Sequence, residues 1–176
     1  MKLYKLIPTN VHKSYNIEGC TLEFNEEFRK TYPLADNWTI KKLKRAGGGM
    51  EASIIFCFYP KAIIIAEDRL PVFESEFKNE KIEFLPVTDG KKNYYILHCY
   101  ECADVKNEVE RQLLKTFYYV DENYGEGLHV FKLLRRGVVN VISAELYTEK
   151  MVSFINRLDD VGIDFEEVGE FRAFPE

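Results

Sequence analysis

Two cysteines form the most chemically suggestive spacing in this sequence. Cys99 and Cys102 make a C-x-x-C motif, which occurs in half of a zinc site or in a redox pair. A zinc site needs a second pair, whereas Cys20 and Cys57 are widely separated. A redox pair favours a helix N-terminus, but Cys99 lies in a strand-like run, where residues three apart point to opposite faces. We therefore interpret both as ordinary part-buried thiols and predict no metal and no cofactor.

Histidines are the candidate acid–base groups. His129 lies in a strand-like run and could act as a base near Tyr124 or Glu126. No G-x-S-x-G setting accompanies Ser143 or Ser153 to mark a nucleophile. A histidine without an identifiable nucleophile or acid is more often structural. The sequence thus predicts no catalytic residue, and a small enzyme using His129 or His98 stays an alternative.

A triple glycine, Gly47-Gly48-Gly49, follows the most basic segment of the chain, 41–45. Glycine-rich loops can cradle a phosphate, but neither G-x-G-x-x-G nor the Lys-Ser/Thr ending of a P-loop is present. We interpret the segment as a flexible loop behind a solvated basic face. A small-molecule or anion-binding regulatory domain remains an alternative function.

An acidic, tyrosine-rich set of residues is the candidate partner-binding surface. Aromatic and charged residues together are typical of interface hot spots, and acidic side chains steer association with a basic partner. The alternatives are cross-strand pairs within a sheet and a solvated edge strand kept soluble by its charge. The candidate residues are Tyr118, Tyr119, Asp121, Glu122, Tyr124, Asp164, Glu166 and Glu167.

Length and composition predict one folded domain. The chain has 176 residues, of which 46% are hydrophobic, so it can bury a core without disulfides or metals. An N-terminal subregion at 1–50 carries the basic glycine loop. The net charge of −5 disfavours nucleic acid as a partner. Without an apolar stretch of signal-peptide or membrane-helix length, we expect a cytoplasmic protein with no membrane partner; a homo-oligomer is compatible with these features.

The apolar pattern predicts many short strands and few helices. Strands are expected at 2–7, 38–40, 53–59, 62–66, 82–87, 94–100, 128–134, 138–142 and 163–168. Helices are expected at 26–32, from 67 to 77, shortly after 105, and from 144 to 158 with Ser143 as its N-cap. The short helix after 105 should give way to a strand before 120. The pattern indicates an α+β fold, a mostly antiparallel sheet of short strands with two to three helices packed against it.

Two segments carry a recognisable order of apolar positions. Pro71-Val72-Phe73-x-Ser75-x-Phe77-Lys78 precedes Ile82-Glu83-Phe84-Leu85-Pro86-Val87, Tyr94-Tyr95-Ile96-Leu97 and Asp104. Ser143 and Glu145 precede an apolar helix face and Gly162-Ile163-Asp164-Phe165. Over roughly the last 110 residues this pattern resembles the immunity-protein family numbered eleven of bacterial polymorphic toxin systems, formerly a domain of unknown function. The resemblance implies a family-like core at 64–170 after the N-terminal subregion. The helix-prone VKNEVERQLLK after Asp104 departs from that family.

The resemblance implies a cytoplasmic protein, encoded beside a toxin, that binds and neutralises the toxin without enzyme activity. Its cognate partner would be that protein toxin. The family supplies no set of toxin-contacting residues for this chain, so the partner-binding candidates above rest on residue type alone.

Overall fold

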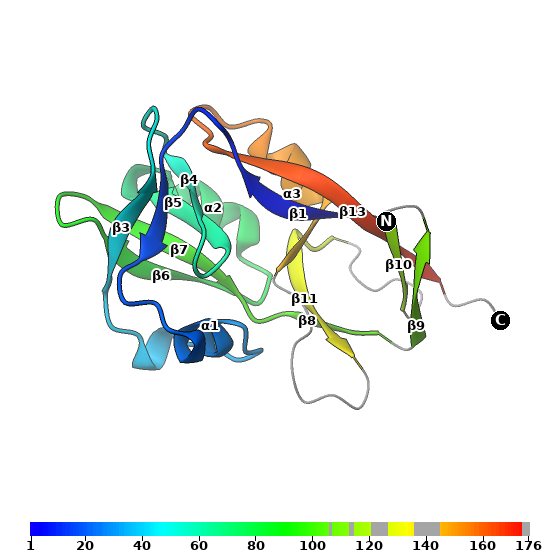
Figure 1. The fold of residues 1–176 in the computed structure, drawn as a ribbon. Helices are drawn as coiled ribbons and strands as arrows, with labels where there is room; N and C mark the ends of the chain where they lie inside the picture. Colours follow the sequence, from blue (N-terminus) through cyan, green and yellow to red (C-terminus); the bar gives the residue numbers. More distant parts are fainter. Residues whose placement is uncertain (106, 113–114, 121–126, 136–144, 174–176) are drawn as a thin grey trace.

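The computed structural model describes the backbone of residues 1–105, 107–112, 115–120, 127–135 and 145–173, and the side chains of 1–103, 127–133 and 145–171. The described chain is α+β and forms two sheets (Figure 1). One is a closed barrel in the order β2-β3-β6-β7-β5-β4, and the other is seven-stranded in the order β8-β11-β12-β1-β13-β10-β9. The predicted α+β class is confirmed.

The barrel strands come from the first hundred residues. They are β2 (Ser14–Ile17), β3 (Lys41–Gly47), β4 (Ile54–Cys57), β5 (Ala62–Ala66), β6 (Ile82–Thr88) and β7 (Asn93–Cys99). Most neighbours pair antiparallel, whereas β2 with β4 and β3 with β6 pair parallel. Closure leaves the barrel without free sheet edges.

The seven-stranded sheet combines the first strand with the second half of the chain. Its strands are β1 (Lys2–Pro8), β8 (Cys102–Val105), β9 (Asn107–Gln112), β10 (Lys115–Val120), β11 (Val130–Arg135), β12 (Leu146–Thr148) and β13 (Ile163–Ala173). β1 lies antiparallel between β12 and β13. The N-terminal strand is therefore held by the C-terminal part of the chain.

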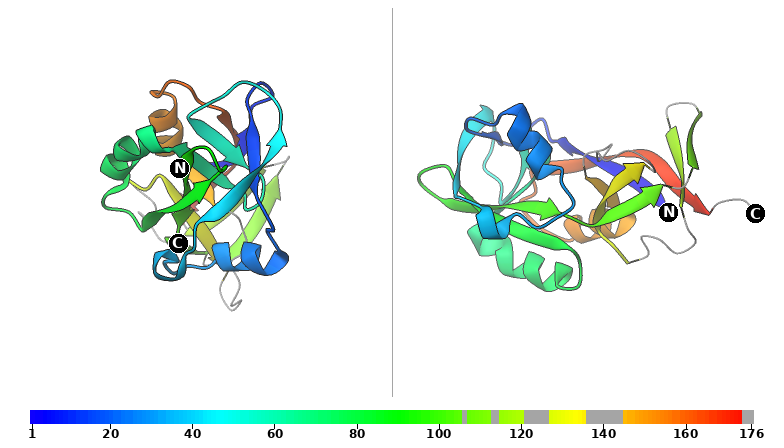
Figure 2. Two further views of the ribbon diagram at one scale, coloured as in Figure 1. Left: turned by 90° about the vertical axis from the view of Figure 1, so that its left-hand side faces the viewer. Right: turned by 90° about the horizontal axis from the view of Figure 1, so that it is seen from below.

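The helices lie on different sides of the molecule. They are α1 (Leu22–Phe28), α2 (Leu70–Phe77) and α3 (Glu149–Ile155), with 3-10 turns η1 (Ala35–Asn37) and η2 (Glu67–Arg69). The views in Figure 2 place α1 on one side and the pair α2 and α3 on another. Within the described chain, no helix combines the length and the apolar character required to cross a bilayer.

The faces of β4 and β5 explain their continuous apolar sequences. Ile55 and Ile64 belong to a cluster with members from all six barrel strands, which fills the barrel. Ile54 and Ile63 point the other way, into a second cluster with α2, α3, β1 and β13. Because both faces are buried, these strands show no apolar–polar alternation. The predicted strands at 53–59 and 62–66 are confirmed.

Two helix predictions are wrong or shifted. The short helix expected after 105 is wrong, since the described residues 107–112 form strand β9, whereas the strand expected before 120 is confirmed as β10, which pairs antiparallel with β9. The segment Leu146–Thr148 is strand β12, and helix α3 begins after Thr148, whose hydroxyl oxygen accepts from the Lys150 N–H. Ser143 and the strand expected at 138–142 lie outside the described residues.

The basic segment at 41–45 is also different from its prediction. It forms most of strand β3, while no strand is assigned at 38–40. Pairing with β2 and β6 closes the barrel, and this tertiary pairing outweighs the local preference of a charged, glycine-flanked sequence for a loop. The first helix likewise begins earlier than expected, at Leu22, because Thr21 caps it through the Phe24 N–H.

Candidate functional site

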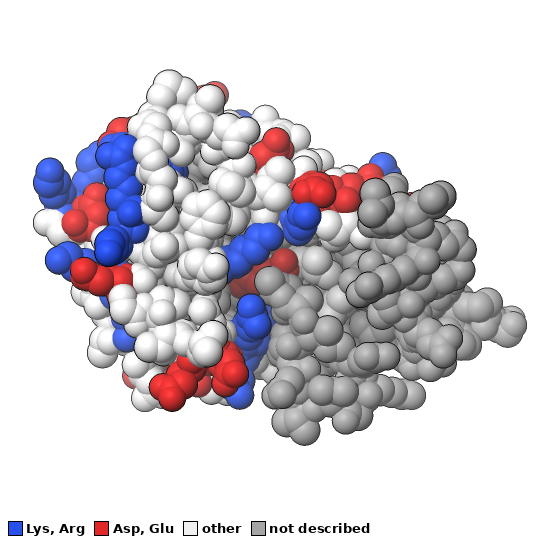
Figure 3. Space-filling model, in the orientation of Figure 1, with Lys and Arg blue, Asp and Glu red and all other residues white. Residues whose placement is uncertain are grey.

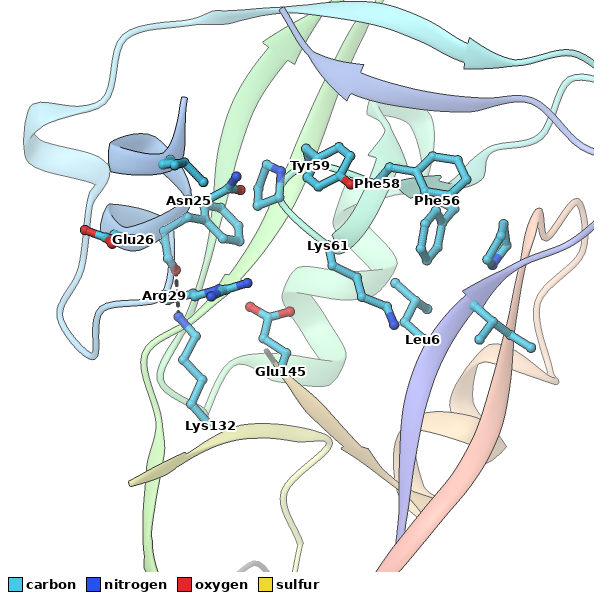
Figure 4. A pocket seen from close by; sticks show the side chains of 15 residues that line it. Leu6, Asn25, Glu26, Arg29, Phe56, Phe58, Tyr59, Lys61, Lys132 and Glu145 are labelled. Carbon is cyan, nitrogen blue, oxygen red and sulfur yellow. Dashed lines mark hydrogen bonds between the residues drawn. The ribbon is translucent and has the colours of Figure 1, made fainter. Parts of the chain in front are cut away.

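A pocket of about 540 Å³ lies where the barrel meets the seven-stranded sheet. Its walls come from the end of β1, from α1, and from the turn that joins β4 to β5; Lys132 of β11 and Glu145 before β12 also line it (Figure 4). We call it the Glu145 pocket. The pocket depends on segments that are far apart in the sequence.

Glu145 is the buried anion of this pocket. Its side chain belongs to a residue that is only 5% exposed. Oε1 accepts a hydrogen bond from the Cys99 N–H at 2.9 Å, and Oε2 accepts one from the Tyr147 hydroxyl at 2.9 Å. Burial and the neighbouring Glu145 charge raise the pKa of Tyr147 well above its usual value, so its hydroxyl remains a donor. Both of these donors are neutral groups.

Lys132 of β11 links the seven-stranded sheet to α1 through hydrogen bonds. Its Nζ donates to the carbonyl oxygens of Phe28 at 2.8 Å and Lys30 at 3.0 Å, and lies 3.2 Å from His98 Nε2. Carbonyl groups at a helix C-terminus lack intrahelical hydrogen-bond donors. The buried Lys132 ammonium donates to two carbonyl groups at the end of α1. Burial lowers the pKa of Lys132, whereas the nearby Glu145 opposes that change. The three N–H groups of the ammonium thus have three partners beneath the pocket.

His98 continues this buried network. Its Nδ1 lies 2.6 Å from Glu83 Oε1, and Glu83 also accepts from the backbone N–H groups of Leu34 at 2.6 Å and Ala35 at 3.1 Å. A ring that donates from Nδ1 to Glu83 and accepts at Nε2 from Lys132 satisfies both contacts. His98 is fully buried and does not line the pocket.

His129 joins helix α2 to strand β11. Its Nδ1 lies 2.5 Å from Glu80 Oε1 and its Nε2 lies 3.0 Å from Glu76 Oε1, while its backbone N–H donates to Glu80 at 2.9 Å. The ring is fully buried, 4.4 Å from the Phe77 ring centroid. These contacts give His129 a structural role and place it outside the lining of the Glu145 pocket.

The predicted partner-binding residues fall into two groups. Tyr118 and Tyr119 belong to β10 without described side chains, and Asp121, Glu122 and Tyr124 lie outside the described residues. Asp164, Glu166 and Glu167 lie on β13. Glu166 pairs with Lys5 at 2.8 Å and Glu167 with Lys2 at 3.3 Å, across the β1–β13 ladder. The structure does not bring this set to the Glu145 pocket, and its role in partner binding stays a prediction.

The structure shows the surroundings of Cys99 and of the triple glycine at 47–49. Cys99 is fully buried, and burial followed by the Glu145 charge raises the pKa of its thiol. Among the described side chains, no group of three or more His, Cys, Asp or Glu residues is placed to bind a metal.

At Gly49 an added Cβ would lie 2.4 Å from Val11 O, which accounts for the glycine. The anion-binding alternative for this loop is left as a prediction.

Sequence reasoning missed the charged residues of the pocket. Lys132 and Lys61 were given no role, Arg29 was part of an expected helix only, and Glu145 entered solely through the family resemblance. A usable signal existed for Lys132, because it is a single charge inside the apolar run Val130–Leu134. Burial of such a charge requires partners. The sequence contained no signal that the turn at 58–61 would face α1.

Comparisons with known protein families, with curated proteins and with solved structures found no match to this chain. The fold and the site define an α+β protein that joins a closed barrel to a second sheet around a pocket with a buried carboxylate.

Proposed function

We propose that this protein is a non-enzymatic immunity protein that binds and neutralises a cognate bacterial toxin, and that the mouth of the Glu145 pocket contacts the toxin. The proposal rests on the family resemblance of the apolar positions and on one structural observation. Large apolar side chains at the pocket are unusually exposed: Leu22 is 82%, Tyr59 59% and Phe58 39% exposed.

An exposed apolar rim around a concave site is typical of a protein-binding surface. Figure 3 shows a broad uncharged area over the barrel side of the molecule, with charged side chains gathered mainly at its borders. The rim residues come from α1 and from the β4–β5 turn. Both are anchored elements, so the rim is already arranged for contact, which reduces the entropy cost of association.

Lys132 and the two residues behind it, His98 and Glu83, support binding over catalysis. Lys132 uses its three N–H groups on Phe28, Lys30 and His98. Glu83 holds the other ring nitrogen of His98. A general base needs access to the proton that it removes, and Lys132, His98 and Glu83 are hydrogen-bonded within the interior. In this proposal the protein acts in the cytoplasm of the toxin-producing cell.

The test uses the product of the neighbouring toxin gene. We expect the protein to co-purify with that toxin and to rescue cells that express it. Tyr59→Ala and Leu22→Ala should weaken binding at least tenfold, as truncation of interface hot spots does. Val72→Ala is the matched control, since Val72 is also exposed, at 43%, but lies on α2. Wild-type affinity of both rim variants, or failure to bind the toxin, contradicts the proposal.

A small-molecule or anion-binding regulatory domain is the second candidate. The pocket volume of about 540 Å³ lies in the range of ligand sites. Native mass spectrometry of protein isolated from the producing cell would detect a co-purified ligand. A stoichiometric ligand that Tyr59→Ala releases would favour this candidate over toxin binding.

A further inference from the structure

The carboxylate of Glu145 keeps unused acceptor capacity toward the pocket. Each carboxylate oxygen can accept about two hydrogen bonds, and among the described residues each has one protein donor, the Cys99 N–H or the Tyr147 hydroxyl. Lys132 lies near enough to influence Glu145 electrostatically, but its N–H groups bind elsewhere. A ligand that reaches the floor of the pocket should therefore bring donors.

The walls of the pocket favour a cation. Phe56, Phe58 and Tyr59 line it, and the faces of aromatic rings attract ammonium and guanidinium groups by about 0.5–2 kcal/mol. Leu6 and Pro8 offer apolar surface beside them. An extended basic side chain presents both surfaces that such a pocket binds, a charged tip with several donors and an apolar stem.

Arg29 and Lys61 line the same pocket and oppose a second cation. Figure 4 shows the Glu145 carboxylate pointing into the pocket, with Arg29 on one side and Lys61 on the other. Arg29 is exposed and Lys61 is partly exposed. Solvent therefore screens the repulsion between each of them and a bound cation to about 1 kcal/mol at 4 Å in water. The attraction to the buried Glu145 is screened less.

An anion would find less favourable contacts in the pocket than a cation. It would approach a buried carboxylate, and the deepest cation, Lys132, has its three N–H groups turned to Phe28, Lys30 and His98. Only the flexible side chains at the mouth would remain to bind it. The buried groups at the floor of the pocket thus favour a cation with hydrogen-bond donors over an anion.

We propose that the Glu145 pocket receives a basic side chain, a guanidinium or alkylammonium group, of the bound protein partner. Glu145 accepts its hydrogen bonds, and the aromatic walls contact its stem. This inference rests on the proposed function for the identity of the partner, whereas the preference for a cation rests on the pocket itself.

Benzamidinium is a suitable probe, with neutral benzamide and anionic benzoate as matched compounds of the same size. We expect benzamidinium to bind the wild-type protein saturably and at least tenfold more tightly than benzamide in a calorimetric or NMR titration. Equal binding of benzamide, or tighter binding of benzoate, overturns the preference for a cation. This comparison requires no variant and so does not depend on the folding of one.

Two variants locate the binding. Glu145→Gln should reduce benzamidinium affinity at least tenfold, whereas Glu26→Gln, which removes an exposed carboxylate lining the same pocket, should change it less than twofold. An equal loss in both variants, or no loss in Glu145→Gln, contradicts the assignment to Glu145.

Competition separates this inference from the proposed function. Toxin should displace benzamidinium from the pocket, and benzamidinium should weaken toxin binding. A toxin that binds without displacing the probe leaves the proposed function standing but overturns the inserted side chain. A probe that binds although no toxin does overturns the partner and identifies a site for a free cationic small molecule.

Discussion

At the scale of single residues, buried charges are paired across segments that are far apart in sequence. Glu83, His98 and Lys132 form one chain of contacts from the barrel to strand β11, and Glu145 lies beside it. Removal of one member of such a set leaves the others buried without a partner, which is more costly than the pair was favourable. These residues therefore hold the floor of the Glu145 pocket in place.

Glu83 makes the free energy of unfolding depend on pH in the acid range. Burial alone raises the pKa of Glu83, but its hydrogen bonds with His98 and with the N–H groups of Leu34 and Ala35 outweigh burial, and the pKa is lowered from the ordinary 4.5. A lowered folded pKa means that the stabilisation is complete above the unfolded pKa and is lost as pH falls through the folded one. Glu83→Gln should cost roughly 1–3 kcal/mol at neutral pH.

Urea denaturation between about pH 6 and about pH 3 measures this effect. Glu83→Gln should lose less stability than the wild type across this acid range, since its side chain does not titrate. The exposed Glu74→Gln on α2 is the control and should follow the wild-type curve. Parallel acid curves for Glu83→Gln and the wild type would count against the assignment.

At the scale of elements, pairing and packing decide what local preference leaves open. Strands β4 and β5 were predictable because continuous β-branched runs suit strands buried on both faces. Strand β3 was not, since a run of lysines and arginine becomes a barrel strand only when β2 and β6 are beside it. The glycines after β3 mark where the chain crosses another backbone segment closely.

Gly49 is required at this crossing. Its φ of +144° disfavours other residues, and an added Cβ would lie 2.4 Å from Val11 O. We expect Gly49→Ala to lower the free energy of unfolding by about 1–3 kcal/mol or more. Gly48→Ala should change it by less than about 0.5 kcal/mol, because the nearest atom, Arg45 Nη2, is 3.6 Å away. Chemical denaturation of both variants checks this, and equal stabilities would refute the close approach.

At the scale of the whole molecule, one hydrophobic cluster joins the two sheets. It combines Phe56 and Ile63 of the barrel with Leu6 of β1, Tyr147 of β12 and Phe154 of α3. A shared core of this kind couples the stability of both parts. We therefore expect one cooperative unfolding transition, as the single-domain prediction requires.

Phe154 tests that coupling. It is 3% exposed and packs against Phe73 with ring centroids 5.0 Å apart. Phe154→Ala should cost about 3–5 kcal/mol. In urea, fluorescence of the single tryptophan, Trp38, which packs against the barrel cluster, and far-UV circular dichroism should shift together. Separate midpoints for the two signals would show that barrel and sheet unfold independently. Val72→Ala, on the exposed face of α2, is the control.

The sequence by itself determined the α+β class, the strands β4 to β7 and helix α2, because continuous apolar runs, apolar periodicity, Pro71 and Asp89-Gly90 act over a few neighbouring residues. Only the tertiary structure decided that the strands split into a closed barrel and a second sheet, since strand partners are chosen by packing over long separations. It also decided the site. Glu145, Lys132 and Phe58 become neighbours of one pocket because burial of a charge requires partners, and those partners lie on other segments of the chain.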